Sequence, residues 1–256
     1  MNTSSHRSFL NLFKHPKPIM GMVHLKGETE DEKLDLAKRE IDIMIDNDID
    51  AVIVENYFGK PDDMRLVLEY IVSQRSHIHY GVNVLDDDLL GFVMAREYKA
   101  HFIQLDSVAG HLYPHDDQNY HDFILSERER TFAFVLGGVR FKYQPYLSGR
   151  TLEEDLQIGM TRSDAIVVTG AATGAETDTG KIKQFRSIIG PDFPLIVGAG
   201  LTAENCRERL LLADGGIIGS YLKDTHKDDG YVSKKHVIAF MKEVKLLREE
   251  INPQHK

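Results

Sequence analysis

Residues 194–223, PLIVGAGLTAENCRERLLLADGGIIGSYLK, decide the fold of this chain. Two short apolar runs, 195–197 and 217–218, end in glycines, and a helical segment that begins near Thr202 separates them. In (β/α)8 barrels the loops after the seventh and eighth strands commonly bind a phosphate through backbone N–H groups and a short helix N-terminus. Glycine lets the backbone approach the phosphate oxygens, although glycines that only form tight turns are the alternative interpretation. The predicted phosphate-binding residues are Gly170, Gly198, Gly200, Gly219 and Ser220.

Length and composition agree with a single barrel. The chain has 256 residues, close to the roughly 250 of a typical barrel, so we expect residues 1–256 to form one α/β domain, a (β/α)8 TIM barrel. The net charge of −9 argues against nucleic-acid binding, which requires a basic face. The lone cysteine, Cys206, excludes an internal disulfide and a cysteine-rich zinc site.

The sequence contains no transmembrane signal. No apolar run approaches the roughly 20 residues that span a bilayer. The opening stretch 1–13, MNTSSHRSFLNLF, is polar and lacks the apolar core of a signal peptide. We therefore expect a cytoplasmic protein without a transmembrane segment.

Strand and helix patterns alternate along the whole chain, which is typical of parallel α/β structure. A long polar loop, 108–119, interrupts this alternation, and we expect it to act as a lid over a substrate. The predicted strands are 18–25, 51–56, 80–85, 102–107, 134–142, 165–170, 195–197 and 217–218. The predicted helices include 29–48, one beginning at Pro61, 87–99, 151–160, 180–189 and 233–251.

Polar residues stand at the ends of six successive predicted strands, where the active sites of such barrels lie. Because side chains alternate along a strand, those that share a face with small or apolar neighbours should converge on one pocket. The predicted catalytic residues are Glu55, Asp106, Lys142 and His24. The predicted substrate-binding residues are Asn56, Asn83, Gln104, Arg140 and Thr169.

Each of these residues has a catalytic and a structural interpretation. Glu55 is the candidate general base, because apolar surroundings would raise its pKa, but it could also pair with an arginine. Lys142 suits the neutralisation of a carboxylate slightly better than Schiff-base formation. His24 could equally be a packed, hydrogen-bonded imidazole, and Asn56 and Asn83 could only tie loops to the rim.

A metal site is the less favoured interpretation. Asp106, Glu55 and His24 would suit a divalent cation, but no ligand motif such as HExxH supports one, so no cofactor is predicted. A second set of potential ligands, which a solvated lid explains better, lies between residues 108 and 121. Its members are His111, His115, Asp116, Asp117 and His121.

Several strings, taken together, resemble the BtpA/SgcQ family over nearly the whole chain. They are IVEN at 53–56, GVNVL at 81–85, VVTGAATG at 167–174, GAGLTAENC at 198–206 and ADGGIIGSYLK at 213–223. The resemblance implies a (β/α)8 barrel of the ribulose-phosphate-binding kind. It also implies a role in biogenesis of a photosynthetic membrane complex for some members and association with sugar uptake for others. The fifth strand departs from the family pattern, with Gly138 and Arg140 where the resemblance implies an aspartate before the lysine.

Three functions from different classes follow. The first is an enzyme, an isomerase, lyase or aldolase, that acts on a small phosphorylated sugar or related phosphate ester. In it Glu55 removes a proton, and Lys142 stabilises a developing enolate or carbonyl oxygen. The second is a non-catalytic biogenesis or stability factor for a membrane complex, and the third is a phosphate-ligand sensor. The polar strand ends favour the enzyme, because a scaffold need not bury polar groups at one mouth.

The final predicted helix indicates self-association. We expect a homo-oligomer, most simply a twofold dimer, because its apolar residues could exceed what the barrel covers. Packing of the same residues on strands eight and one is the alternative. They are Phe240, Met241, Val244, Leu246 and Leu247.

Overall fold

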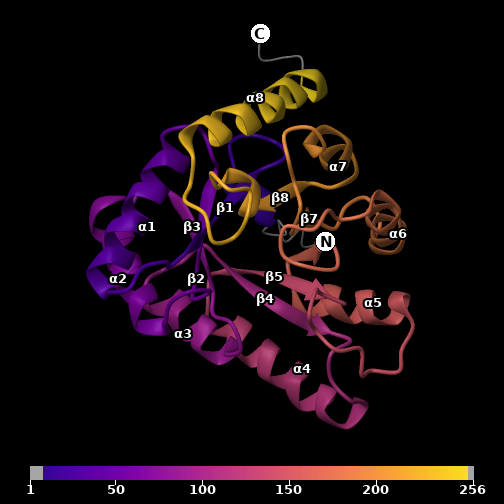
Figure 1. Ribbon diagram of the computed structural model, residues 1–256. Helices are drawn as coiled ribbons and strands as arrows, with labels where there is room; N and C mark the ends of the chain where they lie inside the picture. The colour runs from indigo at the N-terminus through magenta and orange to yellow at the C-terminus, as the bar shows by residue number, and fades with distance from the viewer. Residues whose placement is uncertain (1–7, 253–256) are drawn as a thin grey trace, which may run out of the picture.

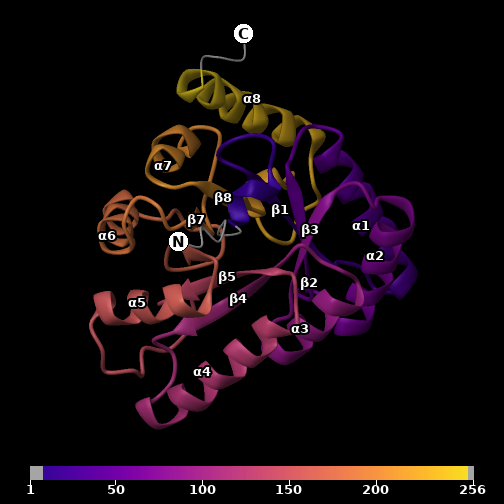
Figure 2. The same ribbon diagram turned by 180° about the vertical axis from the view of Figure 1, so that it is seen from behind.

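Eight short strands close into a parallel barrel in the computed structural model, which describes residues 8–252. The order β1 to β8 follows the chain, and the helices form a ring outside the strands (Figures 1 and 2). The predicted (β/α)8 barrel is therefore confirmed. The part of the signal-peptide prediction that concerns residues 1–7 lies outside the described residues.

The strands and helices have the following bounds. The strands are β1 Ile19–His24, β2 Ala51–Glu55, β3 His79–Asn83, β4 Phe102–Ala109, β5 Phe134–Val139, β6 Ala165–Val168, β7 Leu195–Val197 and β8 Gly215–Ile218. The α-helices are α1 Glu30–Ile45, α2 Pro61–Gln74, α3 Asp88–Glu97, α4 Pro114–Glu129, α5 Leu152–Arg162, α6 Thr179–Ile189, α7 Cys206–Leu212 and α8 Lys234–Ile251. Two 3-10 helices, η1 Phe9–Leu12 and η2 Ser220–Leu222, complete the fold.

Alternation of side chains along the strands separates two apolar clusters. The larger one lies between the strands and the helices, and the smaller one fills the barrel. Phe9 of η1 closes the bottom of the smaller cluster, its ring 5.6 Å from that of Phe102 and 6.0 Å from that of Phe134. The apolar strand residues that fill the barrel are Met20, Met22, Ala51, Ile53, Phe102, Phe134, Leu136, Ala165, Val167, Ile196 and Ile217.

The strand register determines which polar residues meet above this interior. His24 is the register partner of Glu55, and Glu55 is in turn the partner of Asn83. Glu55 shares its strand face with Ile53, so its side chain continues the inward-facing row. Three neighbouring strands therefore present polar groups at one level of the barrel.

Local capping explains why several helices begin where the sequence predicts. The Thr29 side chain accepts a hydrogen bond from the Glu32 backbone at the start of α1. Thr151 and Glu154 form a reciprocal capping box at the start of α5. Pro61 occupies the first turn of α2, where its missing N–H costs nothing.

The predicted fifth strand, 134–142, is too long. Strand β5 ends at Val139, and Arg140 adopts a positive φ of 46° that turns the chain away from the barrel wall. The Arg140 guanidinium bonds to Asp155 of α5 at 3.1 Å. Lys142 consequently lies in the loop after β5 and reaches the barrel mouth from there.

The predicted lid loop, 108–119, is also wrong in extent. Strand β4 continues through a bulge to Ala109, and helix α4 already begins at Pro114. Asp117 is not solvated, because the Arg162 guanidinium bonds to both of its carboxylate oxygens, at 2.9 and 3.0 Å. What remains as an open loop is residues 110–113.

Most of the apolar residues of α8 pack inward. Phe240, Met241, Val244 and Leu247 are buried in the core, as the alternative interpretation expects. Leu246 remains 46% exposed, so the homo-oligomer stays a prediction that rests on a smaller apolar surface. Within residues 8–252 no helix is long and apolar enough to cross a membrane.

A buried ion pair fastens the loop after β8 to α1. The Lys223 ammonium lies 2.8 and 2.9 Å from the two carboxylate oxygens of Glu40, and both side chains are almost fully buried. The Val232 backbone N–H also donates to Glu40, at 2.9 Å. These bonds fix the loop 223–232 beside the barrel mouth.

We predict that Glu40→Gln destabilises the protein by about 3–5 kcal/mol, because it leaves the Lys223 ammonium buried without a counter-charge. Chemical denaturation measures this change. The exposed pair between Lys245 and Asp48 provides the control, since Asp48→Asn should cost less than about 1 kcal/mol. Equal effects of the two substitutions would contradict the prediction.

Candidate active site

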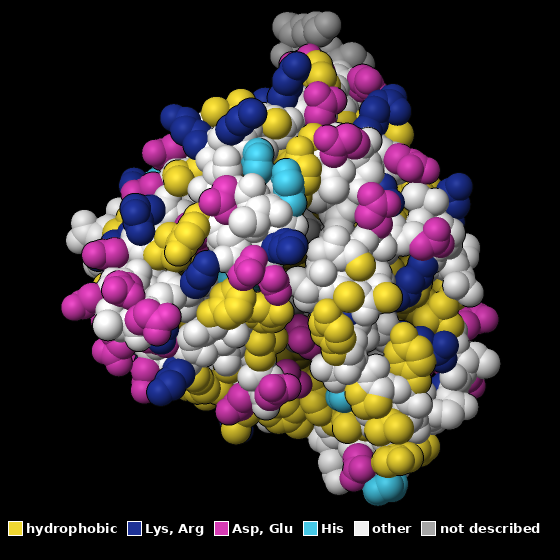
Figure 3. All heavy atoms as spheres, in the orientation of Figure 1, with side chains coloured by type: hydrophobic (Ala, Val, Ile, Leu, Met, Phe, Trp, Pro, Cys, Tyr) yellow, Lys and Arg dark blue, Asp and Glu magenta, His cyan; other side chains and the backbone are white. Residues whose placement is uncertain are grey.

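A cavity of about 590 Å³ opens at the carboxyl ends of the strands. This volume lies within the roughly 300–1,000 Å³ of small-molecule sites. Hydrophobic side chains gather around the centre of this face, with acidic side chains among them (Figure 3). Nine of the predicted site residues line the cavity: His24, Glu55, Gln104, Asp106, Lys142, Gly198, Gly200, Gly219 and Ser220.

Two carboxylates share one amide at the side of the cavity formed by β2, β3 and β4. The Asn83 amide nitrogen donates to Glu55 Oε1 at 2.8 Å and to Asp106 Oδ1 at 3.2 Å. The Gln104 amide nitrogen donates to the same Asp106 oxygen at 3.4 Å. The second carboxylate oxygen of Glu55, Oε2, lies 3.4 Å from Nε2 of His24. We call Glu55, Asp106, Asn83, Gln104 and His24 the acid cluster.

Burial changes the protonation of the acid cluster. Burial first, and then the nearby charge of Asp106, raise the pKa of Glu55 to about 8, although Lys142 and the Asn83 hydrogen bond act in the opposite direction. Burial also raises the pKa of Asp106. Burial lowers the pKa of His24 to about 3. The contact between His24 and Glu55 is therefore a contact of two neutral groups at pH 7, not an ion pair.

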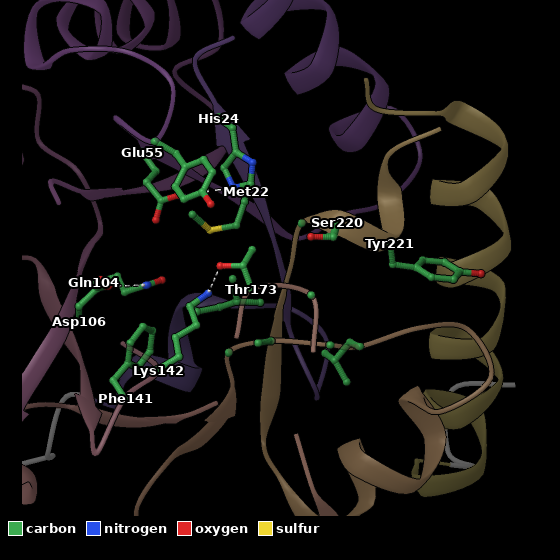
Figure 4. Close-up of a pocket in the computed structure, with 18 of the residues that line it drawn as sticks. Met22, His24, Glu55, Gln104, Asp106, Phe141, Lys142, Thr173, Ser220 and Tyr221 are labelled. Carbon is green, nitrogen blue, oxygen red and sulfur yellow. Dashed lines mark hydrogen bonds and ion pairs between the residues drawn. The ribbon is translucent and has the colours of Figure 1, made fainter. Parts of the chain in front are cut away.

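Lys142 approaches the cavity from the loop after β5. Its ammonium donates to Thr173 Oγ1 at 3.2 Å, a contact that Figure 4 marks with a dashed line. The Tyr143 hydroxyl accepts from the Thr173 backbone N–H at 2.9 Å. These bonds hold the ammonium between the acid cluster and the loops on the other side of the cavity.

The opposite side of the cavity consists of backbone loops. Residues 198–202 follow β7, residues 219–221 follow β8, and Thr173 and Gly174 follow β6. The N–H groups of Ser220 and Tyr221 begin the short helix η2, so they have no partner within that helix. We call these segments the glycine loops. They are the part of the cavity that could hold an anion.

The reason for glycine differs from one loop position to the next. A Cβ atom on Gly200 would lie 2.3 Å from the Ala175 carbonyl oxygen, so Gly200 is required for close packing of two loops. The atoms nearest to a Cβ atom on Gly219 would belong to Met22 and His24, at 3.4 and 3.5 Å, and both of these residues line the cavity. A side chain at position 219 would therefore point into the cavity. A side chain at position 200 would instead point at the backbone of residues 175–176.

Five predicted site residues do not line the cavity. Asn83 lies beneath it within the acid cluster. The Asn56 side chain accepts from the Leu85 backbone N–H at 2.7 Å, which ties two loops together. Thr169 accepts from the Lys142 backbone N–H at 3.0 Å. The other two are Arg140, which bonds to Asp155, and Gly170, which packs on the backbone of 175–176.

Sequence reasoning missed several lining residues. Thr173 and Gly174 belong to the VVTGAATG string, whose loop glycine was a usable signal. Tyr57 directly follows Asn56, and its hydroxyl donates to Asp228 at 2.8 Å across the mouth. The remaining polar lining residues that the sequence did not predict are Asp86, Tyr143, Gln144, Thr202, Glu204, Tyr221 and His226.

The site suits proton transfer more than metal chemistry. Within residues 8–252, no three His, Cys, Asp or Glu side chains gather closely enough to hold a metal ion. His115 and Asp116 of the second predicted ligand set are exposed and contact each other at 3.2 Å. A carboxyl group with a pKa near 8 can both accept and return a proton near neutral pH.

The comparisons identify relatives along nearly the whole chain. A model of the BtpA family matches residues 15–246. An uncharacterised protein of Methanocaldococcus jannaschii is 28% identical, covering 82% of this chain and 88% of its own. The putative sgc region protein SgcQ of Escherichia coli is 25% identical, covering 91% of this chain and 96% of its own. The photosystem I biogenesis protein BtpA of Synechocystis is 24% identical, covering 82% of each chain.

Solved structures resemble the barrel at low sequence identity. Phosphoribosyl anthranilate isomerase of Thermus thermophilus has a TM-score of 0.59 at 14% identity, covering 90% of this chain and 100% of its own. Thiamine phosphate pyrophosphorylase of Pyrococcus furiosus has a TM-score of 0.58 at 13% identity, covering 90% of this chain and 96% of its own. At these identities the likeness shows the fold alone.

We predict that Glu55→Gln removes a pH dependence from the stability of the protein. The folded pKa of Glu55 is raised, so its contribution is present below about pH 4.5 and is lost as the pH rises to about 8. Glutamine resembles the protonated acid, so the variant should be more stable than the parent at pH 8. The gain should amount to a few kcal/mol, because each pKa unit corresponds to about 1.4 kcal/mol.

Urea denaturation at pH 5 and at pH 8 measures this difference. Glu204→Gln is the control, because Glu204 is exposed and its pKa is lowered. Its carboxyl group therefore stays ionised between pH 5 and pH 8, and its replacement should not change how stability depends on pH. A difference between parent and Glu55→Gln that is the same at both pH values would refute the raised pKa.

Proposed function

This chain belongs to the BtpA family, and from that premise we propose that it is an enzyme that transfers a proton on a small phosphorylated molecule. The reaction class is that of an isomerase or lyase acting on a sugar phosphate or a related phosphate ester. The observation that carries the proposal is the acid cluster, in which two buried carboxylates share the Asn83 amide at the wall of a cavity. The glycine loops opposite the acid cluster supply the anion-binding half.

Glu55 is the proposed group that removes the proton from carbon. Its raised pKa gives it a usable fraction of both protonation states near neutral pH, which suits general acid–base catalysis. Asp106 shares the Asn83 amide, so the two carboxyl groups titrate as a coupled pair. One proton can pass between substrate and this pair without leaving the cavity.

Lys142 is the proposed electrostatic partner. Its ammonium stands beside Thr173, between the acid cluster and the glycine loops. In that position it can stabilise negative charge that develops on a substrate oxygen when Glu55 takes a proton. The phosphate would bind to the backbone N–H groups of Ser220 and Tyr221, as anions do at helix starts in such barrels.

Two other functions remain as alternatives. A sensor would use the same cavity without turnover. A role in assembly of a membrane complex is suggested by the name of the Synechocystis relative, a photosystem I biogenesis protein. The raised pKa of Glu55 favours the enzyme over both, because pKa values shifted in this way cluster at catalytic sites.

We predict that Gly219→Ala weakens the binding of phosphate and phosphate esters at least about tenfold. The methyl group would enter the cavity beside Met22 and His24 and displace the anion from N–H groups, a loss of at least one charge-assisted hydrogen bond. Gly200→Val should also weaken binding, through disruption of the loop itself. Titration calorimetry with inorganic phosphate measures the effect.

The matched control is Gly91→Ala in α3, where the added methyl would have one ordinary contact, with Ile103 at 3.6 Å. This variant should bind phosphate as the parent does. Phosphate binding that survives Gly219→Ala unchanged would place the anion elsewhere.

We predict that Glu55→Gln retains phosphate-ester binding but slows turnover by a factor of about 10² to 10⁴, the usual contribution of a general base. A screen of sugar phosphates followed by NMR detects the product, and solvent deuterium exchange at carbon reports proton removal directly. Glu69→Gln, at an exposed position of α2 that does not line the cavity, should keep parental rates. Parental turnover in Glu55→Gln would make Glu55 structural and leave Asp106 as the base.

A further inference from the structure

The charges that line the cavity are unbalanced. Asp86 and Asp106 line it on the side of β2 to β4 beside Glu55, which stays protonated near neutral pH, and Glu204 lines it as well. Lys142 is the single lysine or arginine among the described lining residues. A phosphate monoester adds about −1.5 to −2 charges at neutral pH. A bound phosphorylated substrate would therefore leave the cavity short of positive charge.

Gln104 supplies an independent observation on the same side. Its side chain is 5% exposed and lines the cavity, and Figure 4 shows its amide directed toward the cavity centre. The amide nitrogen faces the Asp106 carboxylate, as its hydrogen bond at 3.4 Å requires. The remaining atom, Gln104 Oε1, is buried and has no hydrogen-bond partner among residues 8–252. A buried acceptor of this kind calls for a donor from a ligand.

Lys142 does not meet this need. Its ammonium is held by Thr173 of the glycine loops, at 3.2 Å, and makes no ion pair with Asp86 or Asp106 among the described residues. Although its charge lowers the pKa of Asp106, burial outweighs it and the net shift is upward. The negative charge of Asp86 also raises the pKa of Asp106, so the two carboxylates lie close enough to repel each other. Asp106 Oδ1 accepts from two amides, but Gln104 Oε1 has no donor, and no cation contacts Asp86 or Asp106 among the described residues.

We propose that the substrate carries a primary amine in addition to its phosphate, and that the ammonium binds against Asp106, Asp86 and Gln104 Oε1. The proposal rests on the proposed function, since it names the substrate class of the same cavity. An ammonium group has three donors and no acceptor, which complements a surface made of acceptors. Its hydrogen bonds to carboxylates are charge-assisted and stronger than those of a hydroxyl.

Two pairs of compounds that exchange only an amine for a hydroxyl test this. They are glucosamine 6-phosphate with glucose 6-phosphate, and 2-aminoethyl phosphate with 2-hydroxyethyl phosphate. Titration calorimetry at pH 7 with the intact protein should give at least one pair in which the amine binds about tenfold tighter or more. Equal affinity within both pairs would overturn the proposal, even if all four compounds bind.

Charge-neutral variants connect the preference to the residues. Asp106→Asn should reduce the preference for the amine over the hydroxyl compound to less than about threefold. Asp86→Asn, at a positive φ of 64° that asparagine tolerates, is the second variant and should reduce the preference partly. Asp192→Asn removes the same charge from an exposed position in the loop before β7, at the opposite end of the barrel, and should change nothing.

The outcomes separate this proposal from the proposed function. A preference for the amine that survives both Asp106→Asn and Asp86→Asn would overturn the assignment of the ammonium to these residues. If inorganic phosphate and all four esters fail to bind, the proposed function itself is wrong. If the esters bind and the amines gain nothing, the proposed function stands and only the amine is excluded.

Discussion

Two hydrogen bonds from one nitrogen atom, Nδ2 of Asn83, are the constraint on which the candidate site depends. An amide nitrogen has two protons, and here one goes to Glu55 Oε1 and the other to Asp106 Oδ1. Both oxygens are thereby committed as acceptors. The proton that Glu55 retains near neutral pH must therefore sit on Oε2, the oxygen 3.4 Å from His24 Nε2. Because the pKa of His24 is lowered to about 3, its imidazole is neutral near pH 7 and adds no positive charge beside that oxygen.

The apolar interior of the barrel stabilises the fold enough to offset the burial of the acid cluster. Below the acid cluster the inward-facing side chains are apolar and buried, from Met22 and Ile53 down to Phe9. This packing excludes water from the carboxyl groups and raises their pKa values. Desolvation of Glu55 costs stability at neutral pH, and the apolar clusters inside and outside the barrel must offset that cost. The same core that folds the chain therefore also sets the protonation of its site.

Much of the fold and part of the site geometry could be predicted from the sequence. Alternation along short apolar strands is local information, so it correctly directed His24, Glu55 and Asp106 into one cavity. The direction of Arg140 was not local, because it depends on Asp155, a residue of the next helix. Pro114 followed by Asp116 and Asp117 is a typical helix start. The high polarity of the same segment favours a loop instead, so the start of α4 was not predicted. Glycine roles, such as that of Gly200, depend on which loop packs against them and require the structure.

The two halves of the cavity differ in what they require from the sequence. The glycine loops offer backbone N–H groups, so many sequences of the same fold could supply them. The acid cluster depends on specific side chains of β1 to β4, and one of them, Glu55, is held in a protonation state that costs stability. A protein that only bound phosphate, as a sensor or scaffold would, could replace Glu55 with an uncharged residue and become more stable. Local rules are broken in this way mainly at functional sites, which is the physical argument for assigning the proposed proton transfer to the acid side of the cavity.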